Sequence, residues 1–337
     1  GGAAPAPGTT GSGGVLGSDP QMPVGPNACA PRVPQRLVLL SDLQHAKSVS
    51  SALGEAARDP GLQVSADTKP FSQKGLVVST SLVHDRLDQA QYAAKSLDTR
   101  FTEVTGCPVA GDAACARGFL ERFTERAFRR AVSSVEIDDL MKVFDLGAQT
   151  DYVTGVKLAV QAALSAPSFT YRSEVGEADA NGTARLTAYE LASELSFMLT
   201  DAPPDDELRA AAQSGALSSP DERARQVERM LALPAVQESL TKTLMAAWQI
   251  ANIFGTVKDP GMFPEYSPAL QSSMYRETDA FVQAVLWTRN APVSELLTSR
   301  ESFVDASLAA IYGVPFTGAD RTALAPATLP AERSGLL

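Results

Sequence analysis

The sequence lacks the short motifs that identify many enzymes and metalloproteins. It has no CxxCH for covalent haem, no CxxC metal pair, no HExxH, no GxSxG and no glycine-rich phosphate loop. Its two isolated histidines, His45 and His84, are too few to build a metal site, and we expect His45 to be a surface or capping residue. No apolar run reaches the roughly 20 residues that span a membrane. The sequence therefore predicts no metal ligand and no cofactor-binding residue, and catalytic residues stay unknown.

Positive charge is also scarce. The formal net charge is -10 and the pI is about 4.8, which argues against a nucleic acid partner. The basic pair Arg129–Arg130 could clamp a carboxylate, but an inter-helix salt bridge is the favoured interpretation. The acidic pairs Asp138–Asp139 and Asp205–Asp206 are typical of solvated residues at helix starts.

The sequence contains three cysteines. Cys107 and Cys115 flank a short, small-residue loop, so we predict a disulfide between them, as suits an oxidising compartment. Two buried thiols are the alternative. Cys29 is left over, either free or bonded to a partner or another segment.

Most of the chain has helical periodicity and begins its helices with recognisable caps. Ser41 with Gln44, Ser133 with Glu136, Thr187 with Glu190 and Ser219 with Glu222 have capping-box spacing. In the helix after Thr187, the apolar stripe comprises Leu191, Leu195, Met198 and Leu199. Helices are predicted at 37–54, 81–98, 113–130, 133–147, 151–165, 187–200, 205–215, 219–231, 234–248, 267–287, 293–298 and 305–312. Residues 55–80 are predicted to be an irregular connection with at most a short strand around Val77–Val78. The predicted class is all-α, with one or more orthogonal multi-helix bundles and few or no strands.

Composition divides the chain into a linker and two helical domains. Residues 1–30 are rich in Gly and Pro, as in a linker, and we expect them to follow a cleaved export signal or a lipid anchor. Residues 31–175 are predicted to form an N-terminal helical domain and 185–337 a C-terminal one, separated by the loop at 175–184. The C-terminal domain is expected to be incomplete at its end, because Gly335, Leu336 and Leu337 would leave apolar surface exposed there. We predict that these three residues pack against another polypeptide.

Several segments together resemble one family: the secreted, multi-domain bacterial proteins first described in planctomycetes, built from tandem domains of unknown function. The resemblance covers about residues 31–337. The segments that carry it are CPVAGDAACARGFLERFTERAFRR (107–130), SAPSFTYRSE (165–174), RLTAYELASELSFMLTDAPPDDEL (185–208), QVERMLALP (226–234), MYRETDAFVQAVLWTRNAPVSELLTSRESFVDASLAAIYGVP (274–315) and ERSGLL (332–337).

The resemblance implies export, a helical body and, in many members, a C-terminal c-type cytochrome part. This chain has no haem-binding cysteine pair, so c-type haem would lie in the remainder of the same precursor or in a partner. The first hypothesis is an extracytoplasmic helical scaffold in a larger assembly with such a part, located in the periplasm, at the outer-membrane surface or outside the cell. The alternatives are an oxidoreductase that acts on an extracellular substrate and whose active site is completed by a missing C-terminal portion, and a structural subunit of a surface assembly. Whether the protein is an enzyme stays open.

Overall fold

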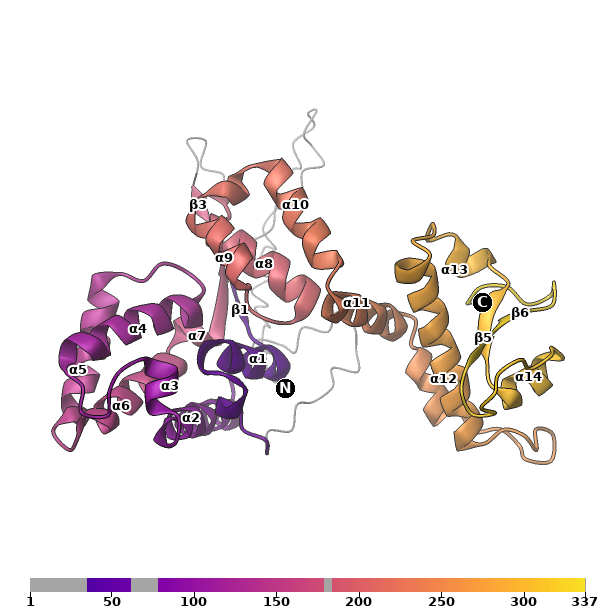
Figure 1. Cartoon of the computed structure of the whole chain (residues 1–337), viewed down its shortest axis with the longest axis horizontal. Helices are drawn as coiled ribbons and strands as arrows, with labels where there is room; N and C mark the ends of the chain where they lie inside the picture. Colours follow the sequence, from indigo (N-terminus) through magenta and orange to yellow (C-terminus); the bar gives the residue numbers. More distant parts are fainter. Residues whose placement is uncertain (1–34, 62–77, 179–183, 337) are drawn as a thin grey trace, which may run out of the picture. The chain divides into compact units, whose positions relative to one another are not determined.

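The computed structural model describes residues 35–61, 78–178 and 184–336, and most of these residues are helical (Figure 1). The α-helices are α1 (Asp42–Leu53), α2 (Thr80–Lys95), α3 (Phe101–Thr105), α4 (Ala113–Phe128), α5 (Ser134–Ala148), α6 (Tyr152–Ser165), α7 (Pro167–Thr170), α8 (Ala188–Thr200), α9 (Asp206–Gln213), α10 (Pro220–Leu231), α11 (Pro234–Ala247), α12 (Pro268–Gln283), α13 (Glu295–Thr298) and α14 (Ala306–Tyr312). Shorter turns of helix are η1 (Glu55–Ala57), η2 (Ser96–Asp98), η3 (Ala216–Ser218), η4 (Ile250–Gly255) and the π-helical η5 (Ala284–Thr288). The predicted helical class is confirmed.

The strands are short and pair two by two. The antiparallel pairs are β1 (Arg36–Leu39) with β2 (Tyr171–Glu174), β3 (Glu177–Ala178) with β4 (Ala184–Arg185), and β5 (Glu301–Val304) with β6 (Ala325–Thr328). The prediction of a helix from residue 37 was therefore wrong at its start, because Arg36–Leu39 pairs with a strand far along the chain. The possible strand at Val77–Val78 falls partly on Val77, outside the described residues, and Val78 is not in a strand.

Local capping interactions determine where several helices begin. Ser41, Ser133 and Thr187 each form the predicted capping box with the residue three positions on. The box predicted at Ser219 is wrong. Its side chain makes no capping bond, and Glu222 accepts hydrogen bonds from Arg225 and Gln226 instead.

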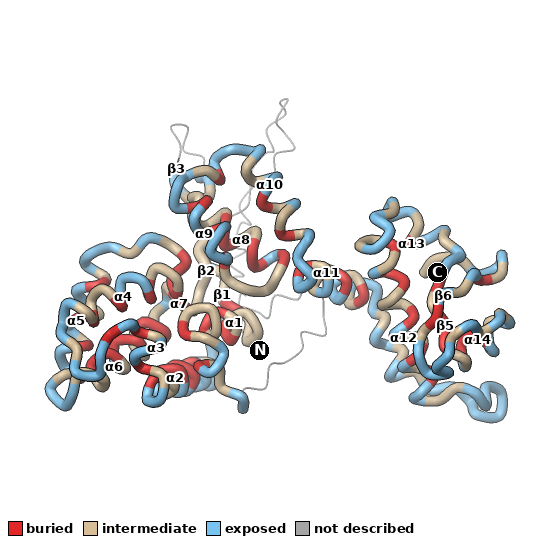
Figure 2. The backbone as a smooth tube through the Cα atoms, viewed as in Figure 1, coloured by how far each residue is buried: buried red, intermediate tan, exposed pale blue. Residues whose placement is uncertain are grey.

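The apolar core has four clusters, the first two of which precede the other two along the sequence. Figure 2 shows the buried residues in red. The first is built from residues 49–169, the second from 192–236, and the third and fourth from residues after 244. By their contacts, the described residues from Arg36 onward form one compact unit.

The buried face of α8 differs from the predicted stripe, and the buried face of α2 differs from the one that apolar spacing indicates. In α8, Leu199 is buried but Met198 is 63% exposed, while the small residues Ala192 and Ser193 are buried. In α2, Val83 and Leu87 are exposed and Arg86 is buried. Small side chains let neighbouring elements approach closely, and the buried Arg86 guanidinium pairs with Asp42 and donates to Leu40 O, so hydrophobicity alone does not identify either face.

Candidate binding cleft

A cleft of about 410 Å³ lies between α12, the β5–β6 sheet, α14 and the final described segment. Polar and apolar side chains share its wall. The lining residues are Ile250, Glu277, Thr278, Phe281, Ser299, Glu301, Ser302, Tyr312, Leu329, Glu332, Arg333, Ser334, Gly335 and Leu336.

Three elements place the polar groups at the base of the cleft. Glu277 lies on the buried face of α12, four residues before Phe281. Ser302 is a buried position of β5, next to the exposed Glu301. Tyr312 ends α14, where Gly313 takes the left-handed conformation with a φ of 68°.

Each oxygen of the Glu277 carboxylate accepts a hydrogen bond from a hydroxyl group. Ser302 Oγ donates to Oε1 at 2.8 Å, and Tyr312 Oη donates to Oε2 at 2.6 Å. Glu277 is only 9% exposed. Burial raises the pKa of Glu277, and the two hydroxyl bonds oppose that shift. Burial, followed by the neighbouring Glu277, raises the pKa of Tyr312, so Tyr312 keeps its proton.

No basic side chain of the described ranges forms an ion pair with Glu277. The one cation among the residues lining this cleft is Arg333, whose guanidinium lies 4.6 Å from the centroid of the Tyr312 ring and whose positive charge also opposes the rise in the pKa of Glu277 that burial causes. Glu301 and Glu332 also line the cleft. When all are ionised, three carboxylates face one guanidinium there, an excess of two negative charges.

The final described segment forms one side of the cleft. Gly335 donates its backbone N–H to Ser299 O at 2.8 Å, and Leu336 donates to Leu296 O at 2.9 Å. A Cβ on Gly335 would lie 2.4 Å from the carbonyl carbon of Leu297, and the φ of Gly335 is 62°.

Two of the three residues predicted as an interface therefore line the cleft. Leu336 packs against the cluster that contains Phe281, so its own chain covers part of it. Leu337 lies outside the described residues. Packing of Gly335, Leu336 and Leu337 against another polypeptide stays a prediction.

A second group of charged side chains comes from β2 and α8, the elements before and after the 175–184 loop. Arg172 Nη2 lies 3.3 Å from Glu174 Oε1 and 3.2 Å from Glu194 Oε1. Burial and the hydrogen bond with Glu174 raise the pKa of Glu194 to about 7. The neighbouring cleft, about 500 Å³, is lined by Arg172 and Glu190. Glu190 already accepts bonds from Ser173, Gly176 and Thr187. The charges of this group face one another as ion pairs, while Arg172 Nε, Glu174 Oε1 and Glu194 Oε1 have no hydrogen-bond partner in the described chain.

The basic pair considered as a carboxylate clamp is also engaged. Arg129 is 5% exposed and donates to the carbonyl oxygens of Ser168, Phe169 and Tyr171. Burial lowers the pKa of Arg129 to about 10. Arg130 forms a salt bridge with Glu136 at 2.7 Å, which agrees with the favoured interpretation for this residue.

The acidic pairs take structural roles on the surface. Asp138 pairs with Arg117 and Asp139 with Lys142. Asp205 caps α9, and Asp206 pairs with Arg126 and Arg209. Exposed pairs of this kind contribute little to stability.

The two histidines differ in their surroundings. His84 is exposed, whereas His45 is 1% exposed and packs edge-on against Phe169 at 5.1 Å between ring centroids. The expectation that His45 is a surface or capping residue was wrong. Burial, followed by the charges of Arg86 and Arg129, lowers the pKa of His45 to about 3. The part of the chain that the structure describes contains no group of three His, Cys, Asp or Glu residues that could hold a metal ion.

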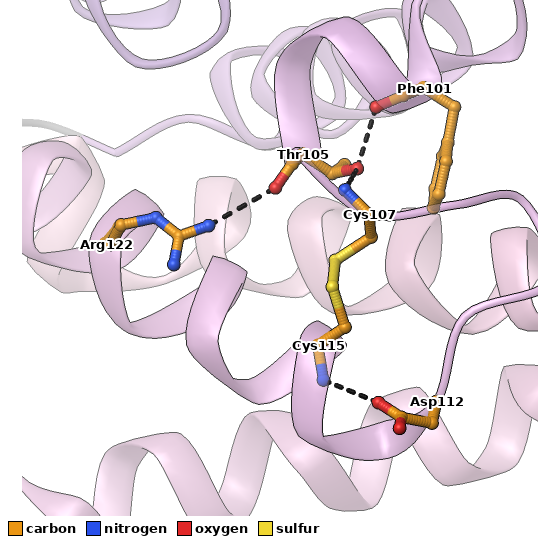
Figure 3. Close-up of a disulfide and its surroundings, with 6 residues drawn as sticks. All are labelled: Phe101, Thr105, Cys107, Asp112, Cys115 and Arg122. Atoms are coloured by element: carbon orange, nitrogen blue, oxygen red, sulfur yellow. Dashed lines mark hydrogen bonds between the residues drawn. A yellow bond between two sulfur atoms is a disulfide. The ribbon is translucent and has the colours of Figure 1, made fainter.

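Cys107 and Cys115 form a disulfide at the start of α4 (Figure 3). Asp112 Oδ1 accepts from the backbone N–H of Cys115 at 2.8 Å, and Thr105 Oγ1 accepts from that of Cys107 at 3.0 Å. The pair is the one that the sequence predicted. Cys29 lies outside the described residues.

Sequence reasoning missed Glu277, Ser302 and Tyr312. One signal was available, because Glu277 lies three positions after Met274 and four before Phe281, a spacing that places it on the same helix face as these apolar residues. Its hydroxyl partners come from elements 25 and 35 residues away, which no local pattern connects.

Two family models match this helical protein. Residues 115–174 are similar to PSD5, described as a protein of unknown function (DUF1595), and residues 186–314 to PSD4, a protein of unknown function (DUF1592). This agrees with a family built from domains of unknown function. Glu277, Ser302 and Tyr312 lie in the PSD4 match, and Arg333, Gly335 and Leu336 lie beyond it. No curated protein and no solved structure matches the chain. Within the described ranges, no helix is both long and apolar enough to cross a membrane.

Proposed function

We propose that the protein is an extracytoplasmic helical interaction module and that the cleft around Glu277 receives part of a partner. The partner is the remainder of the same precursor or another protein of a larger assembly, and it carries c-type haem. The haem part of this proposal rests on the sequence resemblance.

One observation supports the binding role above the others. Glu277 is a buried carboxylate without an ion pair in the described chain, and it lines an open cleft. A buried charge left without a partner of opposite sign is costly, so a group entering the cleft would gain by meeting it. The Arg172–Glu194 group offers no comparable site, because its charges already face one another.

The disulfide supports the location. Disulfides persist in oxidising compartments, and Cys107 and Cys115 are joined in the structure. Extracytoplasmic placement agrees with that bond.

Photo-crosslinking in the native cell tests this function. A photo-reactive amino acid at Thr278, which lines the cleft, should capture one discrete protein, and a haem stain of the denaturing gel should mark the product, because c-type haem is covalently attached. The same group at the exposed Glu228 of α10 is the control and should capture nothing discrete. A product without haem would overturn the cytochrome association. Identical results at Thr278 and Glu228 would overturn the interaction role.

A further inference from the structure

We propose that the cleft around Glu277 recognises an organic cation on a short apolar stem, of the kind that a lysine side chain carries. This inference rests on the proposed function, since it names the chemistry that the same cleft selects. Charge, shape and the available acceptor atoms each support it.

The charged residues that line the cleft determine the sign of the ligand's charge. Glu277, Glu301 and Glu332 line the cleft against the single guanidinium of Arg333. Arg333 lies over the Tyr312 ring and forms no ion pair within the described chain. An entering cation would therefore meet a buried carboxylate that forms no ion pair in the described chain, although the positive charge of Arg333 acts on it and opposes the rise in its pKa that burial causes.

The walls fit an alkyl stem. Phe281 and Leu336 belong to one apolar cluster, and Leu329 to another, and all three line the cleft. Lysine-like cations bury their methylene groups along such surfaces while the charged head reaches polar atoms.

The acceptor atoms favour an ammonium group over a metal ion. Each Glu277 oxygen accepts one hydroxyl bond and keeps further acceptor capacity for an N–H donor. Across the described ranges, no three carboxylate, imidazole or thiolate side chains gather closely enough to hold a metal ion. Spread acceptors suit a multi-donor organic cation better than a small inorganic one.

The test is a calorimetric or NMR titration of the full chain with n-butylammonium, and with n-butanol as the uncharged probe of similar shape. We expect n-butylammonium to bind, n-butanol to bind at least about tenfold more weakly, and added salt to weaken the ammonium complex. Nα-acetyl-lysine methylamide and a lysine-containing peptide form the second arm. Tighter binding of the peptide indicates a lysine of a partner protein, and equal binding a free amine.

Substitutions test whether Glu277 contributes to n-butylammonium binding. Glu277→Gln keeps the shape and removes the charge, and should weaken n-butylammonium binding about tenfold. Glu228→Gln makes the same change on exposed α10 and should leave binding as in the wild type. If Glu277→Gln fails to fold, Glu332→Gln on the exposed rim should still weaken binding measurably.

Equal binding of n-butanol, no binding of n-butylammonium, or unchanged binding in the Glu277 and Glu332 variants would each overturn the inference. If crosslinking at Thr278 still captured a partner, the interaction role would stand without the cation. If n-butylammonium bound but Thr278 captured no partner, the cation site would stand without the interaction role.

Discussion

Three ionisable side chains, the buried His45 and Glu277 and the half-buried Glu194, differ in the groups that face them. His45 faces two arginines and the Phe169 ring, Glu194 faces a second carboxyl group as well as Arg172, and Glu277 faces two hydroxyl groups. A cationic neighbour, an acidic neighbour and a neutral donor have different effects on a titrating group. The pH dependence of stability should therefore separate these sites.

His45 should make the protein less stable in acid. Its pKa is about 3 in the folded protein and near 6.5 in the unfolded chain, so below pH 6.5 only the unfolded chain takes up the proton. The free energy of unfolding contributed by this site then falls by up to about 1.4 kcal/mol per pH unit between pH 6.5 and 3. In His45→Leu, the free energy of unfolding measured by urea denaturation should fall correspondingly less across this pH range. His84→Gln, at an exposed position, should follow the wild type. Parallel curves for wild type and His45→Leu would contradict the assignment.

Glu194 should act with the opposite sign. Its pKa is raised from 4.5 to about 7 on folding, so between these values the folded protein holds a proton that the unfolded chain has released. The stability contributed by this site is full below about pH 4.5 and is lost as the pH rises through 7. Glu194→Gln should remove that loss and be more stable than the wild type at pH 8, by about 1–2 kcal/mol after allowance for partial exposure. Thermal unfolding at pH 5 and pH 8 measures this. A variant that loses stability equally at both values would show that Glu194 is ionised throughout.

Some contacts of these side chains could be predicted from the sequence, and others could not. The partners of Cys107 and of Arg130 were within reach of local reasoning, because each lies within eight residues along the chain. The burial of His45 depends on Phe169, and the hydroxyl bonds of Glu277 depend on two later elements. Contacts of that separation are decided by packing, which one sequence does not reveal.

At the scale of elements, helix starts were easier to predict than buried faces. A capping box involves four consecutive residues, so Thr187 and Glu190 identify it without knowledge of the rest of the fold. The buried face of α8 depends on which neighbours surround the helix, and α8 contacts α9, α10, α11 and β2. With contacts on several sides, Met198 is left outside and Ser193 inside.

The contact between α5 and α6 should be intolerant of added volume. A Cβ on Gly155 would lie 2.8 Å from Phe144 O and 2.9 Å from its ring, which requires the helices to move apart. Gly155→Ala should lower the free energy of unfolding by about 1–3 kcal/mol, measured by urea denaturation. Gly118→Ala is the control within α4, where the nearest atom to a Cβ, the Arg122 side-chain nitrogen, lies 3.5 Å away. This change should raise stability by about 0.5–1 kcal/mol, because alanine favours the helix. Equal effects of the two substitutions would show that the helices can separate freely.

At the scale of the whole molecule, the separate clusters predict more than one unfolding step. The third and fourth clusters share no residue with the first two, and α11 connects the corresponding parts of the chain. Both tryptophans, Trp248 and Trp287, lie in the later part, while the disulfide belongs to the first cluster. Tryptophan fluorescence therefore reports on one part of the chain, and far-ultraviolet circular dichroism reports on all helices.

Removing the disulfide should affect only one of these signals. The bond closes a short loop, and its loss in a Cys107→Ala, Cys115→Ala double variant should cost about 2–3 kcal/mol in the part that contains it. The dichroism transition in urea should then shift to lower concentration while the fluorescence transition stays in place. Leu296→Ala, which empties a 1% exposed position of the third cluster, should cost about 2–5 kcal/mol in the later part, so the fluorescence transition should shift together with only the later part's share of the dichroism signal. If the dichroism and fluorescence transitions shift together in both variants, the described residues from Arg36 onward unfold as one cooperative unit. Stability lost in the first cluster or in the third cluster is then transmitted through α11 to the other part of the chain.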